Sequence, residues 1–192
     1  MNGFRQAVAL VAILNLAYFG VEFTVALSIG SVSLFADSID FLEDTAVNFL
    51  ILIALGWSAH KRSIVGMLLA LALLVPGIAT LWIAWGKIDL PIPPDPVPLT
   101  LTAFGALAVN VSCAFILARF RNHRSSLTRA AYLSARNDAI ANIAIIAAGI
   151  ATAATVSVWP DVIVGLGIFT MNLDAAREVF LAATAEHADA KS

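Results

Sequence analysis

The sequence predicts an all-α membrane protein with six transmembrane helices and both termini in the cytoplasm. Of its 192 residues, 60% are hydrophobic and only 12% are charged, and the mean hydropathy is +0.91. A soluble domain would carry about 25% charged residues, so the composition excludes an ordinary soluble fold. The net charge of −2 offers no basic surface, and we expect no nucleic-acid partner.

Six apolar segments are long enough to cross a bilayer, whose core of about 30 Å needs about 20 helical residues. The first segment is too long for a signal peptide, so we expect it to be retained. The third and fourth segments contain no charge, and a proline-rich linker over residues 86–98 joins them. The segments cover residues 7–30, 33–57, 64–86, 98–119, 129–155 and 160–183.

Basic residues set the predicted orientation. With both termini inside, the outer side holds only Lys87, and Arg136 lies within the fifth segment. The bias follows the positive-inside rule. We therefore expect a transmembrane domain over residues 1–184 and a short cytoplasmic tail over residues 185–192. The basic residues on the inner side are Arg5, Lys61, Arg62, Arg119, Arg121, Arg124, Arg129, Arg177 and Lys191.

The second segment carries four carboxylates, each costing about 2.5–3.5 kcal/mol in a membrane on the insertion scale. If they formed a polar loop, residues 45–57 would be too short to span, so we expect them inside the membrane. Asp37, Asp40 and Asp44 share one helix face, whereas Glu43 points elsewhere. Buried like charges need protonation or a cation, and carboxylate oxygens are ligands for divalent metals.

The fifth segment is the predicted partner of the second. Ser134, Asp138 and Asn142 are spaced four residues apart and share one face. Because this segment enters from the inner side, we expect Asp138 at the depth of the second segment's carboxylates. The patterns Asp44-x-x-x-Asn48 and Asp138-x-x-x-Asn142 echo each other. The asparagines could equally form interhelical hydrogen bonds, and Ser134 could bond its own backbone.

Polar residues in two other segments have local explanations. Asn15 and Glu22 lie seven residues apart in the first segment, and they indicate a structural polar network or a gate. Near the inner end of the sixth segment, we expect Asp174, Arg177 and Glu178 to pair with one another.

Three stretches of the chain carry motifs of a known family: GVEFTVALSIGSVSLFADSIDFLEDTAVNFLIL, AAYLSARNDAIANIAIIAAGI and VWPDVIVGLGIFTMNLDAAREVF. They resemble helices one and two, helix five and helix six of the cation diffusion facilitator family of divalent-metal/proton antiporters. The family motifs are a Glu in helix one, Gly-Ser-x-(Ser/Ala)-Leu-x-Ala-Asp, two (His/Asp)-x-x-x-Asp pairs and a Trp-x-Asp at the start of helix six. The likeness covers nearly the whole chain.

The resemblance implies that Asp40, Asp44 and Asp138 bind the transported metal. Ser134 stands where the family has His or Asp, and a tetrahedral site needs four donors. Zinc is the first expectation. Because the imidazole is missing, harder metals such as manganese and iron are also expected, and cobalt and cadmium stay open. The candidates for the fourth donor are Ser134, Asn142, Asp37 and water.

The function expected from the resemblance is a secondary transporter that exports a divalent metal in exchange for protons, located in a bacterial inner membrane. No cofactor is expected besides the transported metal. The expected partners are metal, protons, lipid and a second copy in a homodimer. We expect a short form without the family's C-terminal cytoplasmic domain. A non-transporting partner subunit stays open, and so does a membrane metalloenzyme, although its phosphate-holding Gly and Arg are missing near the aspartates.

Overall fold

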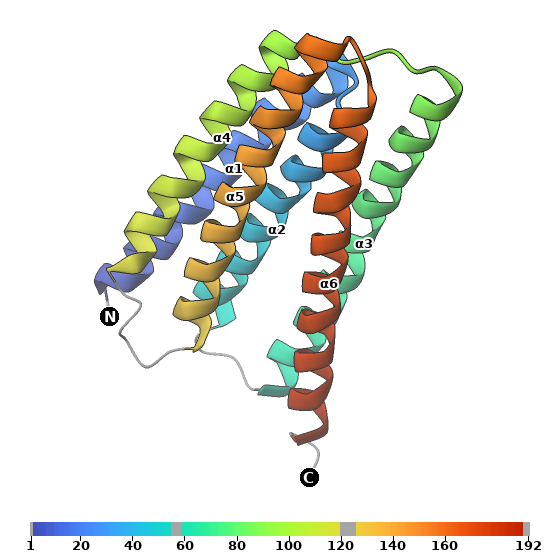
Figure 1. The fold of residues 1–192 in the computed structure, drawn as a ribbon. Helices are drawn as coiled ribbons and strands as arrows, with labels where there is room; N and C mark the ends of the chain where they lie inside the picture. The colour runs from blue at the N-terminus through green and yellow to red at the C-terminus, as the bar shows by residue number, and fades with distance from the viewer. Residues whose placement is uncertain (1, 55–58, 120–125, 190–192) are drawn as a thin grey trace.

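Six α-helices form one bundle in the computed structural model, which describes residues 2–54, 59–119 and 126–189 (Figure 1). All six predicted helices are confirmed. The largest difference is at the end of the last helix, which continues six residues past the predicted residue 183. In chain order the helices are α1 (Asn2–Ile29), α2 (Val32–Ala54), α3 (Ala59–Asp89), α4 (Pro96–Ala118), α5 (Ser126–Thr155) and α6 (Trp159–Asp189).

The helices pack as three close pairs, which are α1 with α2, α4 with α5, and α3 with α6. α2 also packs against α6, and it therefore joins the α3–α6 pair to the rest of the bundle. Figure 1 shows α3 and α6 diverging from the other helices toward the end that carries both termini. The helices meet closely at the opposite end, so the bundle is wider on the side of the termini.

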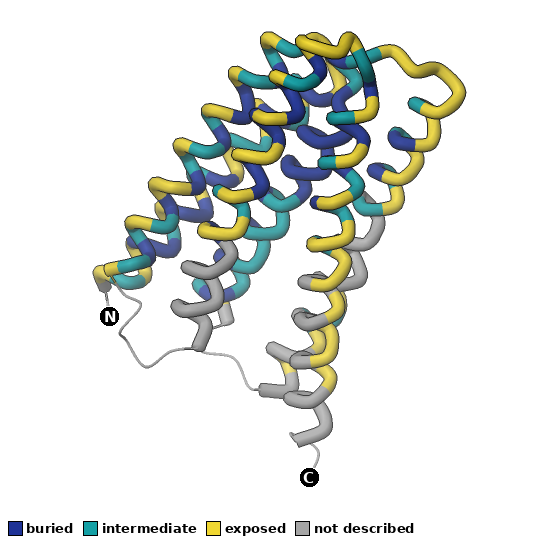
Figure 2. Tube along the Cα trace, in the orientation of Figure 1, coloured by how far each residue is buried: buried dark blue, intermediate teal, exposed yellow. Residues whose placement is uncertain are grey.

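The outward surfaces of the helices are apolar, as expected for contact with lipid. Trp82 is 79% exposed and Phe115 is 71% exposed, while buried residues face the centre of the bundle (Figure 2). Among the described residues, three helices are long and apolar enough to cross a membrane by length and composition: Gly3–Ile29, Pro96–Ala118 and Ala135–Thr155. α2 is not one of these three helices, because its apolar sequence is interrupted by four carboxylates.

The turn between α1 and α2 fixes where the acidic helix begins. Gly30 has a positive φ of 65°, which L side chains rarely adopt. The Ser31 N–H donates to the carbonyl of Ala26 at 3.0 Å, closing the end of α1 in a Schellman-type cap. α2 can therefore start at Val32, directly after the turn, with its serines beside the start of α6.

The proline-rich linker leads into a capped helix. Asp95 is the N-cap of α4, and its carboxylate accepts a hydrogen bond from the Val97 N–H at 3.0 Å. Pro96 occupies the first helical position, where no backbone N–H is needed. Since α3 extends to Asp89, the non-helical part of the linker is shorter than the sequence predicts.

Candidate metal-binding pocket

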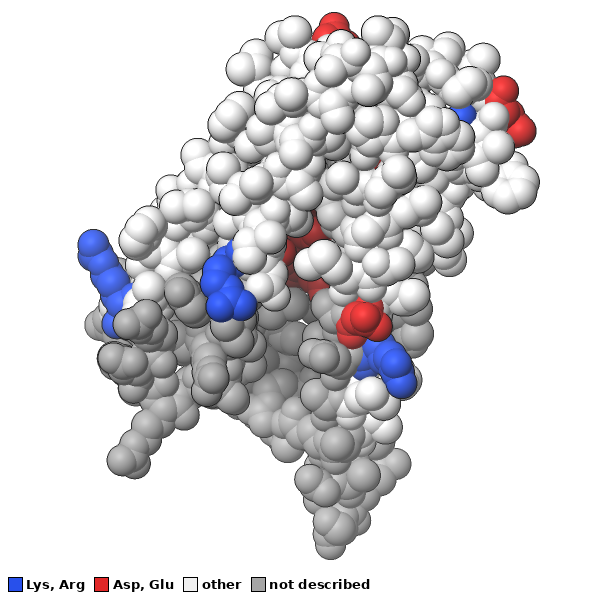
Figure 3. Space-filling view, viewed as in Figure 1, with Lys and Arg blue, Asp and Glu red and all other residues white. Residues whose placement is uncertain are grey.

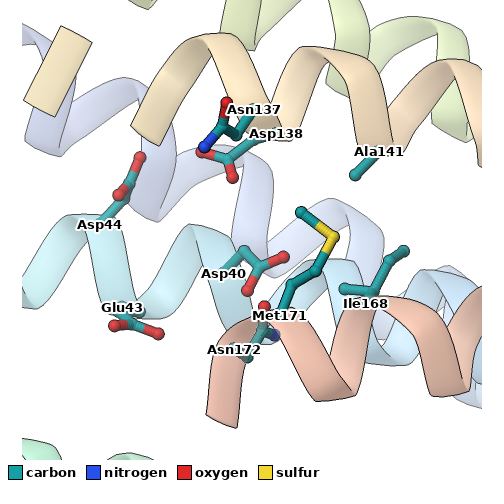
Figure 4. Close-up of a pocket in the computed structure, with 9 residues that line it drawn as sticks. All are labelled: Asp40, Glu43, Asp44, Asn137, Asp138, Ala141, Ile168, Met171 and Asn172. Atoms are coloured by element: carbon teal, nitrogen blue, oxygen red, sulfur yellow. The ribbon is translucent and has the colours of Figure 1, made fainter. Parts of the chain in front are cut away.

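A polar pocket of about 110 Å³ lies inside the bundle between α2, α5 and α6 (Figure 4). α2 and α5 run in opposite directions (Figure 1), so acidic residues that enter from opposite ends of the bundle meet at this level. The lining residues are Asp40, Glu43, Asp44, Asn137, Asp138, Ala141, Ile168, Met171 and Asn172.

Three of the predicted ligands surround this pocket. Asp40 and Asp44 lie one turn apart on α2, and Asp138 of α5 points toward α2 from the other side (Figure 4). The carboxylate of Asp40 interacts electrostatically with those of Asp44 and Asp138. Like charges at such a site repel one another, and either a cation or bound protons relieve the repulsion. The pocket therefore has the electrostatic character of a cation site.

Four polar or sulfur-containing side chains line the pocket that the sequence did not single out as ligands. Glu43 was expected to point elsewhere, yet it borders the same space, on the other side of α2 from Asp44 (Figure 4). Asn137 precedes Asp138 on α5, and Met171 and Asn172 come from α6. Asn172 is a polar residue within the apolar sixth segment, so the sequence did indicate a polar contact there. Spacing along α6 does not show which residues of the other helices it faces.

Two of the predicted donors, Asp37 and Asn142, lie outside the pocket. They bind each other instead: the Asn142 side-chain amide donates to both carboxylate oxygens of Asp37, at 3.2 and 3.1 Å. Both residues are fully buried. Asp37 is one turn closer to the start of α2 than Asp40, and at that depth α5 presents Asn142 rather than a cavity. These two residues form a separate polar group, which lies between the pocket and the start of α2.

Glu22 of α1 completes this separate group. It is fully buried, and its carboxylate interacts electrostatically with that of Asp37. Among the described residues, neither carboxylate oxygen of Glu22 has a hydrogen-bond partner. The two polar residues of α1 therefore belong to different groups: Glu22 faces Asp37, whereas Asn15 bonds to Asp44.

The repeated Asp-x-x-x-Asn pattern produces the same local structure on both helices. The Asn48 amide donates to the backbone carbonyl of Asp44 at 2.7 Å, and the Asn142 amide donates to the carbonyl of Asp138 at 2.7 Å. Of the two asparagines, Asn142 also has the interhelical bonds to Asp37 described above. The pattern therefore ties each asparagine to its own helix one turn after a pocket carboxylate.

Asn15 of α1 orients a pocket carboxylate. Its side-chain amide donates to Oδ2 of Asp44 at 3.3 Å, and its own Oδ1 accepts from the Cys113 thiol at 3.6 Å. Asn15 is fully buried. Groups that orient a ligating carboxylate influence metal affinity without touching the metal.

We therefore expect Asn15→Leu to weaken metal affinity up to about 10-fold, because Asp44 loses the donor that orients it. Thr24→Val on the same helix is the matched control, since Thr24 is exposed and its hydroxyl bonds to the carbonyl of Gly20 in its own helix. Calorimetric titration with Zn²⁺ measures both variants. Equal affinity in Asn15→Leu and wild type would contradict this role.

The remaining predicted donor is Ser134, whose side chain lies outside the described part of the structure. Among the described residues, no three His, Cys, Asp or Glu side chains are gathered tightly enough to hold a metal ion. The pocket carboxylates therefore surround one space without converging on a single point.

The fold and the pocket together define the class of protein. A membrane bundle whose interior carboxylates come from two antiparallel helices has a functional polar site within the membrane, of the kind that binds cations or protons. The chain matches the family described as the cation efflux transmembrane domain over residues 8–186. It belongs to this family, which confirms the resemblance, and it is an integral membrane metal-cation transporter rather than an enzyme. A comparison with curated proteins gives no match.

Proposed function

We propose that this protein exports a divalent transition-metal cation, with zinc as the first choice, in exchange for protons. Asp40, Asp44 and Asp138 would hold the metal. The observation that carries the proposal is that these three carboxylates, from two antiparallel helices, line one interior pocket. Carboxylate oxygens accept zinc as well as harder divalent cations.

The pocket offers a source for the fourth donor. Asn172 lines the same space, and a carboxamide oxygen is a hard, neutral donor. Asn137 also lines it, but its Oδ1 accepts a hydrogen bond from Arg136 at 3.3 Å. Asp37 and Asn142 are occupied with each other, which makes them weaker candidates than the sequence suggested. An all-oxygen set would favour manganese or iron relative to a site containing imidazole. The Met171 thioether would favour softer ions, including cadmium.

Proton exchange follows from the chemistry of the donors. A carboxylate that carries a proton is a poor ligand, so metal binding releases protons and protons displace the metal. Like charges on three carboxylates that line one pocket repel one another, and either a cation or bound protons would relieve the repulsion. One site would then hold either the metal or protons. This alternation is the simplest coupling for an exchanger.

The shape of the bundle supports an orientation with the termini in the cytoplasm. Both termini lie at the wider end (Figure 1), and most Lys and Arg side chains visible in Figure 3 lie toward that end. Acidic side chains are visible inside a hollow between the helices in the same view (Figure 3). The described conformation would then present the carboxylates to the cytoplasm, and tilting of helices would expose them to the other side.

The transport test uses the purified protein in proteoliposomes with an acidic interior. We expect Zn²⁺ to accumulate faster in these vesicles than in vesicles without a pH gradient, because outward proton flow drives metal inward. A proton ionophore should remove the difference. Uptake that is independent of the gradient would contradict proton exchange, and absence of any uptake with intact metal binding would favour the non-transporting alternative.

A second prediction concerns pH and metal affinity. Calorimetric titration with Zn²⁺ should give weaker binding at about pH 6 than at about pH 7.5, because protons compete for the pocket carboxylates. Repeating the titration in buffers with different ionisation enthalpies gives the number of protons released per metal. A release of zero protons at both pH values would argue against a shared carboxylate site.

A further inference from the structure

Asp161 joins two helices at the end of the bundle opposite the termini. It lies in the first turn of α6 and is fully buried. Its carboxylate accepts four hydrogen bonds from the start of α2. The donors are Ser31 Oγ at 2.6 Å, Val32 N at 2.8 Å, Ser33 N at 3.1 Å and Ser33 Oγ at 2.5 Å. Two of these donors are backbone N–H groups that a helix leaves unpaired at its N-terminus.

The charge of Asp161 suits this place. The carboxylate lies at the N-terminal ends of both α2 and α6, where the helix dipoles favour a negative group. An ionised carboxylate only accepts hydrogen bonds, so it can serve all four donors at once. An asparagine at position 161 would turn one acceptor oxygen into an NH₂ donor facing other donors.

Gly165 brings the two helices into backbone contact one turn further along α6. A Cβ atom at this position would lie 2.7 Å from the backbone carbon of Val32 and 2.8 Å from the nitrogen of Ser33. No side chain fits there without displacement. The start of α2 is therefore held to α6 at two successive turns, by hydrogen bonds at Asp161 and by close packing at Gly165.

Lys87 of α3 adds a third contact near Asp161 and the start of α2. The Lys87 ammonium donates to the carbonyl of Ile92 at 2.8 Å and lies 3.1 Å from where a Cβ of Gly30 would be. Its positive charge interacts favourably with Asp161. α2, α3, α6 and the α1–α2 turn therefore converge around the buried carboxylate of Asp161, at the end of the bundle opposite the termini.

We infer that Asp161 is a positioning residue, which fixes the rotation and depth of α2 and thereby places Asp40 and Asp44 in the pocket. α2 is one continuous helix from Val32 to Ala54. Asp40 lies seven residues after Ser33, about 10 Å along the axis. If α2 rotated about its axis where it contacts Asp161, Asp40 and Asp44 would no longer face Asp138. Asp161 does not line the pocket, so it would act only through α2.

The test is the zinc affinity of Asp161→Asn, measured by calorimetry on the purified full chain at a temperature well below its thermal midpoint. This inference rests on the proposed zinc site. We expect about 10-fold weaker binding, the lower end of the range for residues that orient ligands. Zinc uptake into proteoliposomes should show the change mainly as a raised KM, since the site is misplaced rather than removed.

A loss of stability alone would not weaken the binding of zinc by protein that is still folded. Tyr18→Phe provides this control, because it removes a comparable hydrogen bond between helices, from the Tyr18 hydroxyl to the carbonyl of Thr102 at 2.7 Å. That bond joins α1 to α4 and involves no residue at the start of α2. We expect Tyr18→Phe to lower the thermal midpoint and to keep wild-type affinity.

If Asp161→Asn does not fold, the double variant Ser31→Ala/Ser33→Ala carries the test, since it removes two of the four bonds and keeps the carboxylate. Wild-type affinity in a folded variant of either kind, alongside lost binding in Asp40→Asn, would overturn the positioning role and leave the zinc site intact. Wild-type affinity in Asp40→Asn as well would show that the proposed site itself is wrong.

Discussion

Replacing Asp138 by asparagine is expected to reduce zinc transport by at least about 100-fold, beyond the 10–100-fold cost of losing a group that only supports a ligand. Asp138 is the one acidic residue that α5 contributes to the pocket. Asparagine keeps the shape of the side chain and removes both its charge and its ability to take up a proton. Binding and proton exchange should therefore fail together. Asp44→Asn on the opposite helix should have an effect of the same size.

The matched control for these variants is Asp174→Asn. It removes the same charge from α6, but Asp174 is exposed and does not line the pocket. We expect transport close to the wild-type rate. Initial rates of Zn²⁺ uptake into proteoliposomes, normalised to the amount of reconstituted protein, compare the three variants. Near-normal transport by Asp138→Asn would refute the site, and an equal loss in Asp174→Asn would point to a general effect of charge.

The six helices could be predicted from the sequence because membrane helices follow simple rules. Backbone groups in lipid must be paired within the segment, so every long apolar run becomes a helix. A length argument placed the acidic residues of α2 in a helix, because residues 45–57 alone would be too short to cross the bilayer. The end of α6 was less predictable. Hydropathy marks where a segment leaves the apolar region, and a helix can continue beyond that point, here to Asp189.

The candidate site was predictable in part. Helical spacing correctly brought Asp40, Asp44 and Asp138 to one pocket, because both the face and the depth follow from residue number. Asp37 shares that face and yet lies outside the pocket, bonded to Asn142. Spacing along one helix says which side a residue faces, but the neighbour at each depth is decided by how other helices pack.

The supporting residues were the least predictable for the same reason. Asn15 reaches Asp44 from α1 across 29 positions of sequence, and Asn172 reaches the pocket from α6. Neither belongs to a repeated spacing with the acidic residues. The partner of Asp161 is likewise 130 positions away at Ser31. Contacts of this kind depend on the crossing of helices, which one sequence does not specify.

Gly165→Ala is expected to destabilise the protein by about 1–3 kcal/mol, the usual cost of forcing extra volume into a packed interface. The added methyl group would meet the backbone of Val32 and Ser33, and backbone cannot move aside as the end of a flexible side chain can. α6 must then move away from α2 at Gly165, one helical turn after Asp161. The thermal midpoint in detergent should fall by several degrees, given about 2–4 °C per kcal/mol for a chain of this size.

Gly167→Ala is the matched control two residues away on the same helix. A Cβ there meets no atom within 4 Å, so only the intrinsic helix preference changes, and alanine is favoured by about 0.5–1 kcal/mol over glycine. We expect an unchanged or slightly raised midpoint. If both variants lowered the midpoint equally, the loss would come from glycine flexibility in α6. A loss confined to Gly165→Ala ties the stability of the bundle to the contact between α6 and the start of α2, the same contact that would set the register of the pocket carboxylates.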